Sequence, residues 1–454
     1  MKKQLSLLVL LCALAAGLHS QSIDGSWKGL LSAGPSKLNL VFHFAHDDGG
    51  RPTCLMDSPD QGAKGLPAVV QYLQGDSVSV AFPALGATYC GRLREGRIEG
   101  HFTQLGMSLP LTLQPGSVEL RRPQMPRPPY PYEMQEVAFP NGTDGNTLCG
   151  TLTLPVGYDG SRPATAILLV TGSGQQNRDE ELFGHKPFLV LADYLARNGI
   201  ATLRCDDRGV GCSTGKAEGR TTFDNMADAL AGLNYLESTQ RFARIGVLGH
   251  SEGGLIAFML ASRHPGKVGF VVSLAGNAVR GDSILLEQNR MGLRASGVPP
   301  TLCDDYCRAL RAVLDYRRAG LPVADAAFLA DSLATAVGAQ LPPEAVGNLS
   351  HCLAERNAWL DYFIAYDPAD DIAATRCPVL ALNGSLDCQV AAAPNLAVLR
   401  RLLPPDSRTV VREYPGLNHL FQHCTTGNVS EYGSIEETLS PEVLAVIAAW
   451  VNGL

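Results

Sequence analysis

Residues 249–254, with the sequence GHSEGG, constrain the fold of this chain more than any other stretch. An apolar run (IGVL) precedes them and a second apolar run (LIAF) follows, which predicts a strand, a G-x-S-x-G turn and then a helix. Such a sharp turn crowds its neighbours, so the residues that flank Ser251 must be small. It lifts the serine hydroxyl clear of the sheet, which makes Ser251 a candidate nucleophile. The alternative is a glycine-rich turn whose serine only caps the helix.

The N-terminus has the pattern of a secretory signal. Lys2 and Lys3 precede an apolar run at 5–18, and short polar residues follow, so cleavage is expected near Ser20. A membrane anchor needs about 20 apolar residues, more than this run provides. We therefore expect a signal peptide at 1–20, a secreted or periplasmic protein, and no membrane span in the mature chain.

Composition narrows the class of protein. The length of 454 residues suits two or three domains, and a net charge of −7 argues against a nucleic-acid partner. Of the 12 cysteines, all but Cys12 lie beyond the signal, without C-x-x-C pairs, which argues against a zinc site and a dense disulfide scaffold. Pairing stays open, and several cysteines are expected to be small buried hydrophobes. Candidate bridges lie between Cys54 and Cys90 and among Cys303, Cys307 and Cys352.

Residues 22–118 predict a small all-β domain, either a barrel or a sandwich. Apolar and polar residues alternate with a period of two, and turn residues separate the expected strands at 37–44, 77–80, 89–93 and 97–102. The histidines in this region are expected to face solvent rather than to bind metal; they are His43, His46 and His101. A proline-rich stretch, assigned as a linker at 119–133, resists both helix and sheet.

Residues 134–454 predict an α/β domain. Short apolar strands alternate with helical patterns, as in a mostly parallel, doubly wound sheet; the strands are expected at 151–154, 166–170, 201–204, 245–248, 270–273, 379–382 and 409–412. Between about 277 and 372 this rhythm breaks and the pattern is mostly helical, including a helix at 301–318. An insertion of this size between two strands is a candidate cap over the strand ends. A final helix is expected from Ser440.

Two later loops supply partners for the serine. Asp387 follows the expected strand at 379–382, and His419 follows the strand at 409–412. A serine needs a base to take its proton and a third group to orient that base, and the order Ser, acid, His is that of the α/β-hydrolase fold. The alternatives are a solvated turn aspartate and a loop histidine that packs on its apolar neighbours. His250 is expected to pack rather than to act as the base.

The oxyanion hole needs two backbone N–H groups aimed at the developing charge. One is expected from Glu252. The other is expected from Ser173 or Gly174, in the tight turn that follows the strand at 166–170. Phosphate binding by this turn is a weak alternative because no P-loop lysine follows.

Other polar and aromatic residues lie near the expected site. The pairs 178–179 and 207–208 are interpreted as salt-bridged loop anchors in preference to substrate contacts. Trp359, Tyr362 and Phe363 are candidates for an acyl pocket, and core packing of a helix explains them equally well.

Several of these segments together carry a family resemblance. They are TGSGQQNRDE (171–180), RCDDRGVGCSTG (204–215), GHSEG (249–253), NGSLD (383–387) and GLNH (416–419). They resemble the EstD-type esterases of the α/β-hydrolase superfamily, which neighbour the serine aminopeptidase and bile-acid acyltransferase/thioesterase groups. The resemblance covers most of residues 134–454. It implies a secreted or periplasmic carboxylesterase for short acyl esters, with helices capping the site, and the N-terminal β region resembles a companion domain of some of these proteins.

The function expected from the sequence is therefore hydrolysis of a small-molecule ester through an acyl-enzyme. Ser251 attacks, His419 shuttles the proton and Asp387 orients the imidazole, with no cofactor and no metal. An exported serine aminopeptidase, with an acid pair such as 304–305 or 370–371 to grip an amine, and an acyl thioesterase are alternatives. A more distant one is a non-catalytic envelope- or carbohydrate-binding protein. The oligomeric state and the substrate stay open, because the cap decides the shape of the pocket.

Overall fold

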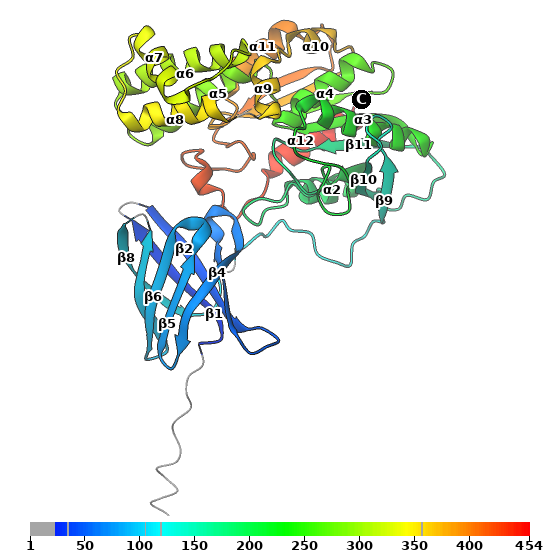
Figure 1. The fold of residues 1–454 in the computed structure, drawn as a ribbon. Helices are drawn as coiled ribbons and strands as arrows, with labels where there is room; N and C mark the ends of the chain where they lie inside the picture. The colour runs from blue at the N-terminus through cyan, green and yellow to red at the C-terminus, as the bar shows by residue number, and fades with distance from the viewer. Residues whose placement is uncertain (1–22, 34–35, 105, 119, 356) are drawn as a thin grey trace, which may run out of the picture. The chain divides into compact units, whose positions relative to one another are not determined.

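The computed structural model describes residues 23–33, 36–104, 106–118, 120–355 and 357–454 (Figure 1). The predicted signal segment lies outside them. The chain divides into two compact units, Met1–Arg121 and Arg122–Leu454. Among the described residues, no helix is both long and apolar enough to cross a bilayer.

The first unit holds a closed antiparallel barrel. Each strand pairs with the next, and β1 closes the barrel on β8 through the pairs Trp27↔Pro115 and Lys28↔Gln114. Alternate side chains point inward, where the ring of Phe42 lies 5.7 Å from that of Phe82 and 5.1 Å from that of Tyr89. The described strands are β1 (Gly25–Ala33), β2 (Ser36–His46), β3 (Pro52–Ser58), β4 (Ala63–Gln74), β5 (Ser77–Phe82), β6 (Ala87–Arg94), β7 (Arg97–Gln104) and β8 (Met107–Pro115).

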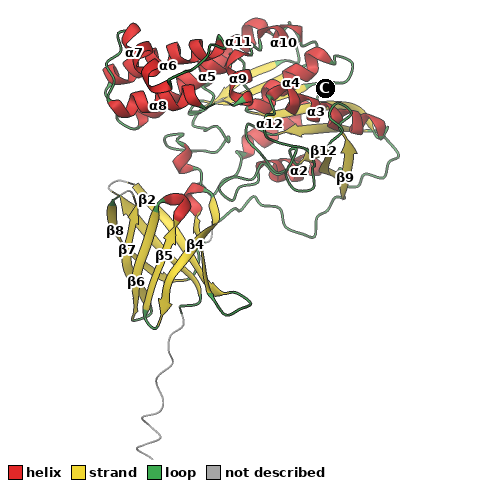
Figure 2. Ribbon diagram, viewed as in Figure 1, coloured by secondary structure: helices red, strands yellow, loops and turns green. Residues whose placement is uncertain are grey.

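The second unit is built on a mixed sheet (Figure 2). Its strand order is β16-β15-β14-β13-β11-β12-β10-β9. Strands β11 to β16 run parallel to one another, whereas β10 is antiparallel to both β9 and β12. The predicted α/β-hydrolase fold, with a small β domain before it, is confirmed. The strands are β9 (Met134–Pro140), β10 (Thr147–Thr153), β11 (Ala164–Val170), β12 (Ile200–Cys205), β13 (Phe242–His250), β14 (Val271–Leu274), β15 (Val379–Gly384) and β16 (Val410–Tyr414).

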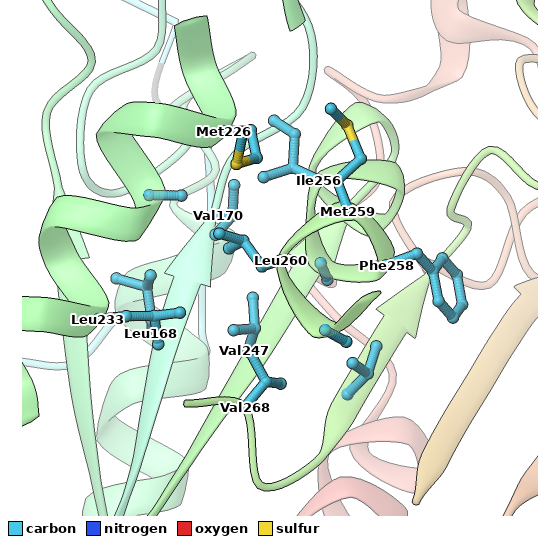
Figure 3. Close-up of a cluster of buried hydrophobic side chains, with 14 of the residues drawn as sticks. Leu168, Val170, Met226, Leu233, Val247, Ile256, Phe258, Met259, Leu260 and Val268 are labelled. Atoms are coloured by element: carbon cyan, nitrogen blue, oxygen red, sulfur yellow. The ribbon is translucent and has the colours of Figure 1, made fainter. Parts of the chain in front are cut away.

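Helices cover both faces of this sheet. Because strand side chains alternate between faces, Leu168 joins one core with α3, α4, α10 and α11, whereas Ile167 joins the other with α2 and α12. Figure 3 shows the first core, where Leu168 and Val247 of the sheet lie among side chains of α3 and α4. The helices are α2 (Pro187–Arg197), α3 (Thr222–Ser238), α4 (Glu252–Arg263), α10 (Ala369–Ala374), α11 (Ala392–Leu402) and α12 (Pro441–Asn452).

Between β14 and β15, helices α5 to α9 form a cap with a hydrophobic core of its own. They pack against one another (Figure 1) and bury side chains such as Leu310 and Leu349. At the start of α5 the fully buried Asp282 forms salt bridges with Arg280, Arg311 and Arg318. The helices are α5 (Gly281–Ala295), α6 (Pro300–Arg318), α7 (Ala326–Ala336), α8 (Pro343–Ala354) and α9 (Ala358–Ala365).

The cysteines pair differently from the candidates raised by the sequence. A disulfide joins Cys149 of β10 to Cys212 in the loop that follows β12, across a sequence separation of 63. Cys54 and Cys90 do not bridge, because Cys54 is buried in the barrel whereas Cys90 is exposed. The cap cysteines, Cys303, Cys307 and Cys352, are also free thiols.

Candidate active site

Ser251 occupies the turn between β13 and α4, as the strand–turn–helix pattern predicts. Its backbone has φ 54° and ψ −120°, a strained conformation for a residue with a side chain. Two hydrogen bonds hold the turn: the Ser251 N–H donates to the Leu274 carbonyl at 2.9 Å, and the Gly254 N–H donates to the Ser251 carbonyl at 3.0 Å. The structure therefore holds this serine in the geometry of a nucleophile elbow.

The glycines beside the serine are required by close backbone packing. A Cβ on Gly249 would overlap the carbonyl of Gly253, and a Cβ on Gly253 would overlap the carbonyl of Val170. Both obstacles are backbone atoms, which cannot move aside as the end of a side chain can.

Asp387 and His419 lie in the loops that follow the neighbouring parallel strands β15 and β16. The carboxyl ends of parallel strands meet at one edge of the sheet, and there His419 Nδ1 lies 2.8 Å from Asp387 Oδ2. The His419 side chain is 5% exposed and that of Asp387 is fully buried. With Nδ1 engaged by the carboxylate, Nε2 is the ring nitrogen that can act as a base.

The Asp387 carboxylate is held from two sides. Oδ1 accepts the backbone N–H groups of Gln389 and Val390, both at 2.8 Å, and Oδ2 accepts the side-chain amide of Asn383 at 3.1 Å. These contacts fix the carboxylate, and through it the histidine ring. The sequence analysis did not assign Asn383, although it precedes Asp387 by only four residues.

Residues 171–176, which we call the oxyanion loop, lie against the serine. A Cβ on Gly172 would stand 3.2 Å from the Cβ of Ser251. The Gly172 N–H already donates a hydrogen bond to Glu180 Oε1, at 2.8 Å. The candidate oxyanion donors in this loop are therefore the next two residues in the chain, Ser173 and Gly174.

Charged side chains hold the oxyanion loop in place. Asp207, in the loop after β12, accepts hydrogen bonds from the Thr171 hydroxyl at 3.0 Å and from the Gln176 N–H at 3.1 Å. Arg220 contacts both Asp207 and the carbonyl of Gly174. Burial raises the pKa of Asp207 to about 6. The loop thus depends on a largely buried carboxylate whose pKa lies above its ordinary value.

The pairs 178–179 and 207–208 form salt bridges, as the interpretation of loop anchors expects. They are Arg178–Asp206 (2.7 Å), Asp179–Lys186 (3.2 Å), Asp179–Arg204, Asp207–Arg220 (3.4 Å) and Arg208–Asp228 (2.7 Å).

One of the three candidate acyl-pocket residues contacts Glu252, the residue that follows Ser251. The indole N–H of Trp359, in the cap helix α9, points at both carboxyl oxygens of Glu252, at 2.9 and 3.0 Å. Glu252 is 1% exposed, and burial raises its pKa. Phe363 stacks on Trp359 within the cap core, and Tyr362 stacks on Tyr366.

A cleft of about 1050 Å³ runs between the oxyanion loop and α9. Its lining is mostly polar or small, with Trp359 as the large aromatic residue. The lining residues are Ser173, Gly174, Gln175, Ala217, Glu218, Gly219, Arg220, Asn357, Ala358, Trp359 and Asp361.

His250, which the sequence analysis expected only to pack, is buried but also hydrogen-bonded. Its Nδ1 lies 2.9 Å from Glu180 Oε1, and its Nε2 lies 3.0 Å from the carbonyl oxygen of His419. In the barrel, His43 pairs with Asp57, and His101 is exposed. No group of three His, Cys, Asp or Glu side chains within the described ranges is placed to hold a metal ion.

The region around Ser251 is similar to known hydrolases. Residues 186–294, which include Ser251 and its turn, match the family described as Serine aminopeptidase, S33. Over 161 residues the chain is 32% identical to Esterase EstD of Thermotoga maritima, a stretch that makes up 35% of the chain and 38% of that protein. The match thus spans less than half of the relative's length. Both names are those of hydrolases, which confirms the predicted resemblance.

The solved structures that match this chain include esterases and a peptidase. The Pyrococcus furiosus esterase Pf2001 is 15% identical with a TM-score of 0.42, over 74% of this chain and 98% of that one. Est1E from Butyrivibrio proteoclasticus with bound ferulic acid is 17% identical with a TM-score of 0.40, over 70% and 99%. A Mycobacterium smegmatis proline iminopeptidase is 17% identical with a TM-score of 0.42, over 70% and 98%.

Proposed function

We propose that this protein is a serine carboxylesterase that hydrolyses short-chain acyl esters through an acyl-enzyme on Ser251. The observation that carries the proposal is the buried His419–Asp387 pair, at 2.8 Å, because the His419 carbonyl contacts His250, the residue that precedes the strained Ser251. A base oriented by a buried carboxylate next to an elevated serine hydroxyl is the arrangement that acyl transfer requires.

In the proposed reaction, Ser251 Oγ attacks the ester carbonyl carbon while His419 Nε2 takes the hydroxyl proton. The N–H groups of Glu252 and Ser173, or Gly174, stabilise the tetrahedral oxyanion. The bond to the alcohol oxygen then breaks, and His419 returns the proton to the leaving alkoxide. Water repeats these steps on the acyl-enzyme, which releases the acid and restores the serine.

The preference for short acyl groups is inferred from the cleft that borders the candidate oxyanion donors Ser173 and Gly174. Pockets for long apolar ligands are lined mainly by apolar side chains. Here Gln175, Arg220, Asn357 and Asp361 border the cleft, and Trp359 is the large apolar surface. We therefore expect acetyl and butyryl esters to be better substrates than long-chain esters.

Peptide cleavage is less well supported, although the family match carries the name of a serine aminopeptidase. The acid pairs considered as amine sites are engaged elsewhere: Asp304 pairs with Arg290, and Asp305 with Arg308. Asp371 contacts Arg263. Three of the four candidate acids thus already face an arginine.

The test is a substrate panel with the purified protein. It contains p-nitrophenyl esters of increasing acyl length, acyl thioesters and aminoacyl anilides, each assayed with the wild type and with Ser251→Ala. We expect a steep preference for short esters and a loss of kcat on the order of 10⁶ in the variant. Near-normal ester turnover by Ser251→Ala would contradict the nucleophile, and dominant anilide or thioester cleavage would contradict the substrate class. A failure of the wild type to react with a fluorophosphonate probe would favour a non-catalytic binding protein.

Export is part of the same proposal, and it rests on the basic and apolar pattern of residues 2–18. Expression of the full chain in a bacterial host should deliver a protein that begins near Gln21 to the periplasm. A protein that keeps its intact N-terminus and stays in the cytoplasm would contradict export, and the esterase proposal would be unaffected.

A further inference from the structure

A second histidine–carboxylate pair lies beside the proposed triad, and the acyl-transfer mechanism does not use it. His250 and Glu180 are 7% and 3% exposed, and their side chains meet at 2.9 Å. Apolar residues such as Phe188, Leu191 and Phe421 surround the pair. In such surroundings a charge interaction is far stronger than at the surface.

The hydrogen bonds of His250 indicate which protons it carries. Nδ1 faces a carboxylate oxygen, and Nε2 faces the carbonyl of His419, which can only accept. A neutral imidazole has one N–H and satisfies only one of these acceptors. A neutral pair would require the proton on Glu180 Oε1, the oxygen that also accepts the Gly172 N–H. The contacts are therefore best satisfied by an imidazolium and a carboxylate.

This pair connects the three parts of the proposed site. His250 precedes Ser251 in the chain, its Nε2 holds the backbone of His419, and Glu180 holds Gly172 next to the candidate oxyanion donor Ser173. Glu180 and Ser251 both have positive φ angles, 52° and 54°. Strained backbone persists only where the surroundings over-determine it, and the ion pair fixes both segments.

We propose that His250 is a doubly protonated positioning residue that, paired with Glu180, holds the nucleophile turn, the oxyanion loop and the backbone of His419 in one frame. The inference rests on the proposed hydrolase function. It assigns to these two residues a role in positioning and none in proton transfer to substrate.

The pH dependence follows from the groups that face His250. These are Glu180 of the loop after β11, Asp387 of the loop after β15, and His419 of the loop after β16. Burial lowers the pKa of His250, but the nearby Glu180 carboxylate, with a smaller effect of Asp387, outweighs it and raises the pKa above the ordinary value. The stabilising contribution is therefore complete below about pH 6.5 and is lost as pH rises through the raised pKa.

The decisive variant is Glu180→Gln, because the amide oxygen can still accept from Gly172 and His250 while the charge is removed. We expect kcat to fall about 10- to 100-fold with little change in KM, because the reacting groups are misplaced. The alkaline limb of the kcat/KM profile should move to lower pH by about one pH unit or more. His250→Gln, which has no group that titrates in this range, should lose that limb.

The matched control is Asp57→Asn in the barrel, which removes the carboxylate from another histidine pair of 2.9 Å, with His43. It should leave kcat and the pH profile unchanged. An alkaline limb that stays in place in Glu180→Gln would overturn the proposal. If Glu180 had only a structural role, Glu180→Gln would have a lower melting temperature and a smaller fraction that reacts with a fluorophosphonate. The alkaline limb of the remaining active fraction would then stay in place.

A readout without activity separates this inference from the proposed function. Long-range ¹H–¹⁵N spectra of histidine-labelled protein, assigned by the signal missing in His250→Gln, should show both ring nitrogens of His250 protonated at pH 7. One protonated and one bare nitrogen would overturn the inference, even if ester hydrolysis is established. If both ring nitrogens of His250 are protonated but no Ser251-dependent hydrolysis is found, the proposed esterase function is contradicted and the inference about His250 protonation is not.

Discussion

At the level of single residues, close backbone packing restricts which residues the turn around Ser251 can contain. Its glycines are not there for flexibility, since a methyl group on Gly249 or Gly253 would meet backbone carbonyls. The same tight packing brings Gly172 against Ser251 and so sets the distance between this serine and the oxyanion loop. Local sequence predicts the need for Gly249 because its obstacle lies within the turn, whereas the obstacle to a larger residue at 253 lies on strand β11.

Gly253→Ala tests whether close backbone packing requires glycine at this position. The added methyl group must displace the backbone of Val170, so we expect a loss of about 1–3 kcal/mol in the free energy of unfolding and a lower kcat, because Glu252 is adjacent. Chemical denaturation and ester turnover measure the two effects. Gly292→Ala is the control: this exposed residue of α5 has no atom within 4 Å of the new methyl group, and the change should stabilise by about 0.5–1 kcal/mol. Equal stability of both variants would contradict the steric argument.

At the scale of the element, loops that follow different strands support one another. The loop after β12 carries Asp207, which holds the loop after β11. The loop after β15 carries Asp387, which contacts His419 in the loop after β16. Each loop by itself is a short polar segment. Its conformation is determined by the neighbouring loop, because the parallel strands deliver all of them to one edge.

Asp207→Asn tests the electrostatic part of this support. The pKa of Asp207 is raised from 3.8 to about 6, so between these values the folded state binds more protons, and this carboxyl lowers the free energy of unfolding as pH rises. The shift of about 2 units corresponds to at most about 3 kcal/mol, and the 19% exposure of the side chain reduces it. Relative to the variant, the wild type should therefore lose stability between pH 4 and pH 7 in urea denaturation.

The control for this experiment is Asp159→Asn. Asp159 is exposed, and a hydrogen bond from Ser161 lowers its pKa, so it contributes a small dependence of the opposite sign. The same pH dependence in the wild type and in Asp207→Asn would show that the carboxylate ionises as freely in the folded protein as in the unfolded one.

At the scale of the whole molecule, the two compact units have separate hydrophobic cores. The barrel core draws its described residues from 23–113, whereas the cores of the α/β unit and its cap begin at Val137. Compact units with separate cores can unfold in separate transitions. The proposed catalytic residues all belong to the second unit.

Phe42→Ala tests this independence. Phe42 is fully buried in the barrel, and its truncation should cost about 3–5 kcal/mol. We expect calorimetry of the wild type to show two transitions, and the variant to lower one of them while ester turnover at 25 °C stays unchanged. Phe258→Ala, a matched truncation in α4, should lower the other transition and turnover. A joint shift of both transitions in either variant would contradict separate unfolding.

Much of the fold follows from the sequence because it is encoded over short distances. Apolar periodicity predicted the central strands, and the closed barrel belongs to one of the two β architectures anticipated for residues 22–118. Strand β4 was missed because Gly65 and Pro67 resemble a turn, and its pairing depends on β3 and β5. The Cys149–Cys212 disulfide was missed because nothing local links residues 63 positions apart.

The turn that presents Ser251, and the order in which Asp387 and His419 follow it, can be predicted from the chain alone, because strands, turns and strand-end residues are local features. The partners of those residues depend on the fold. It brings Glu180 to His250 across 70 positions, Trp359 to Glu252 across 107, and the carbonyl of His419 to His250 across 169. The physical reason is that burial makes unpaired polar groups costly, so each must find a partner that only the folded sheet and cap place within reach.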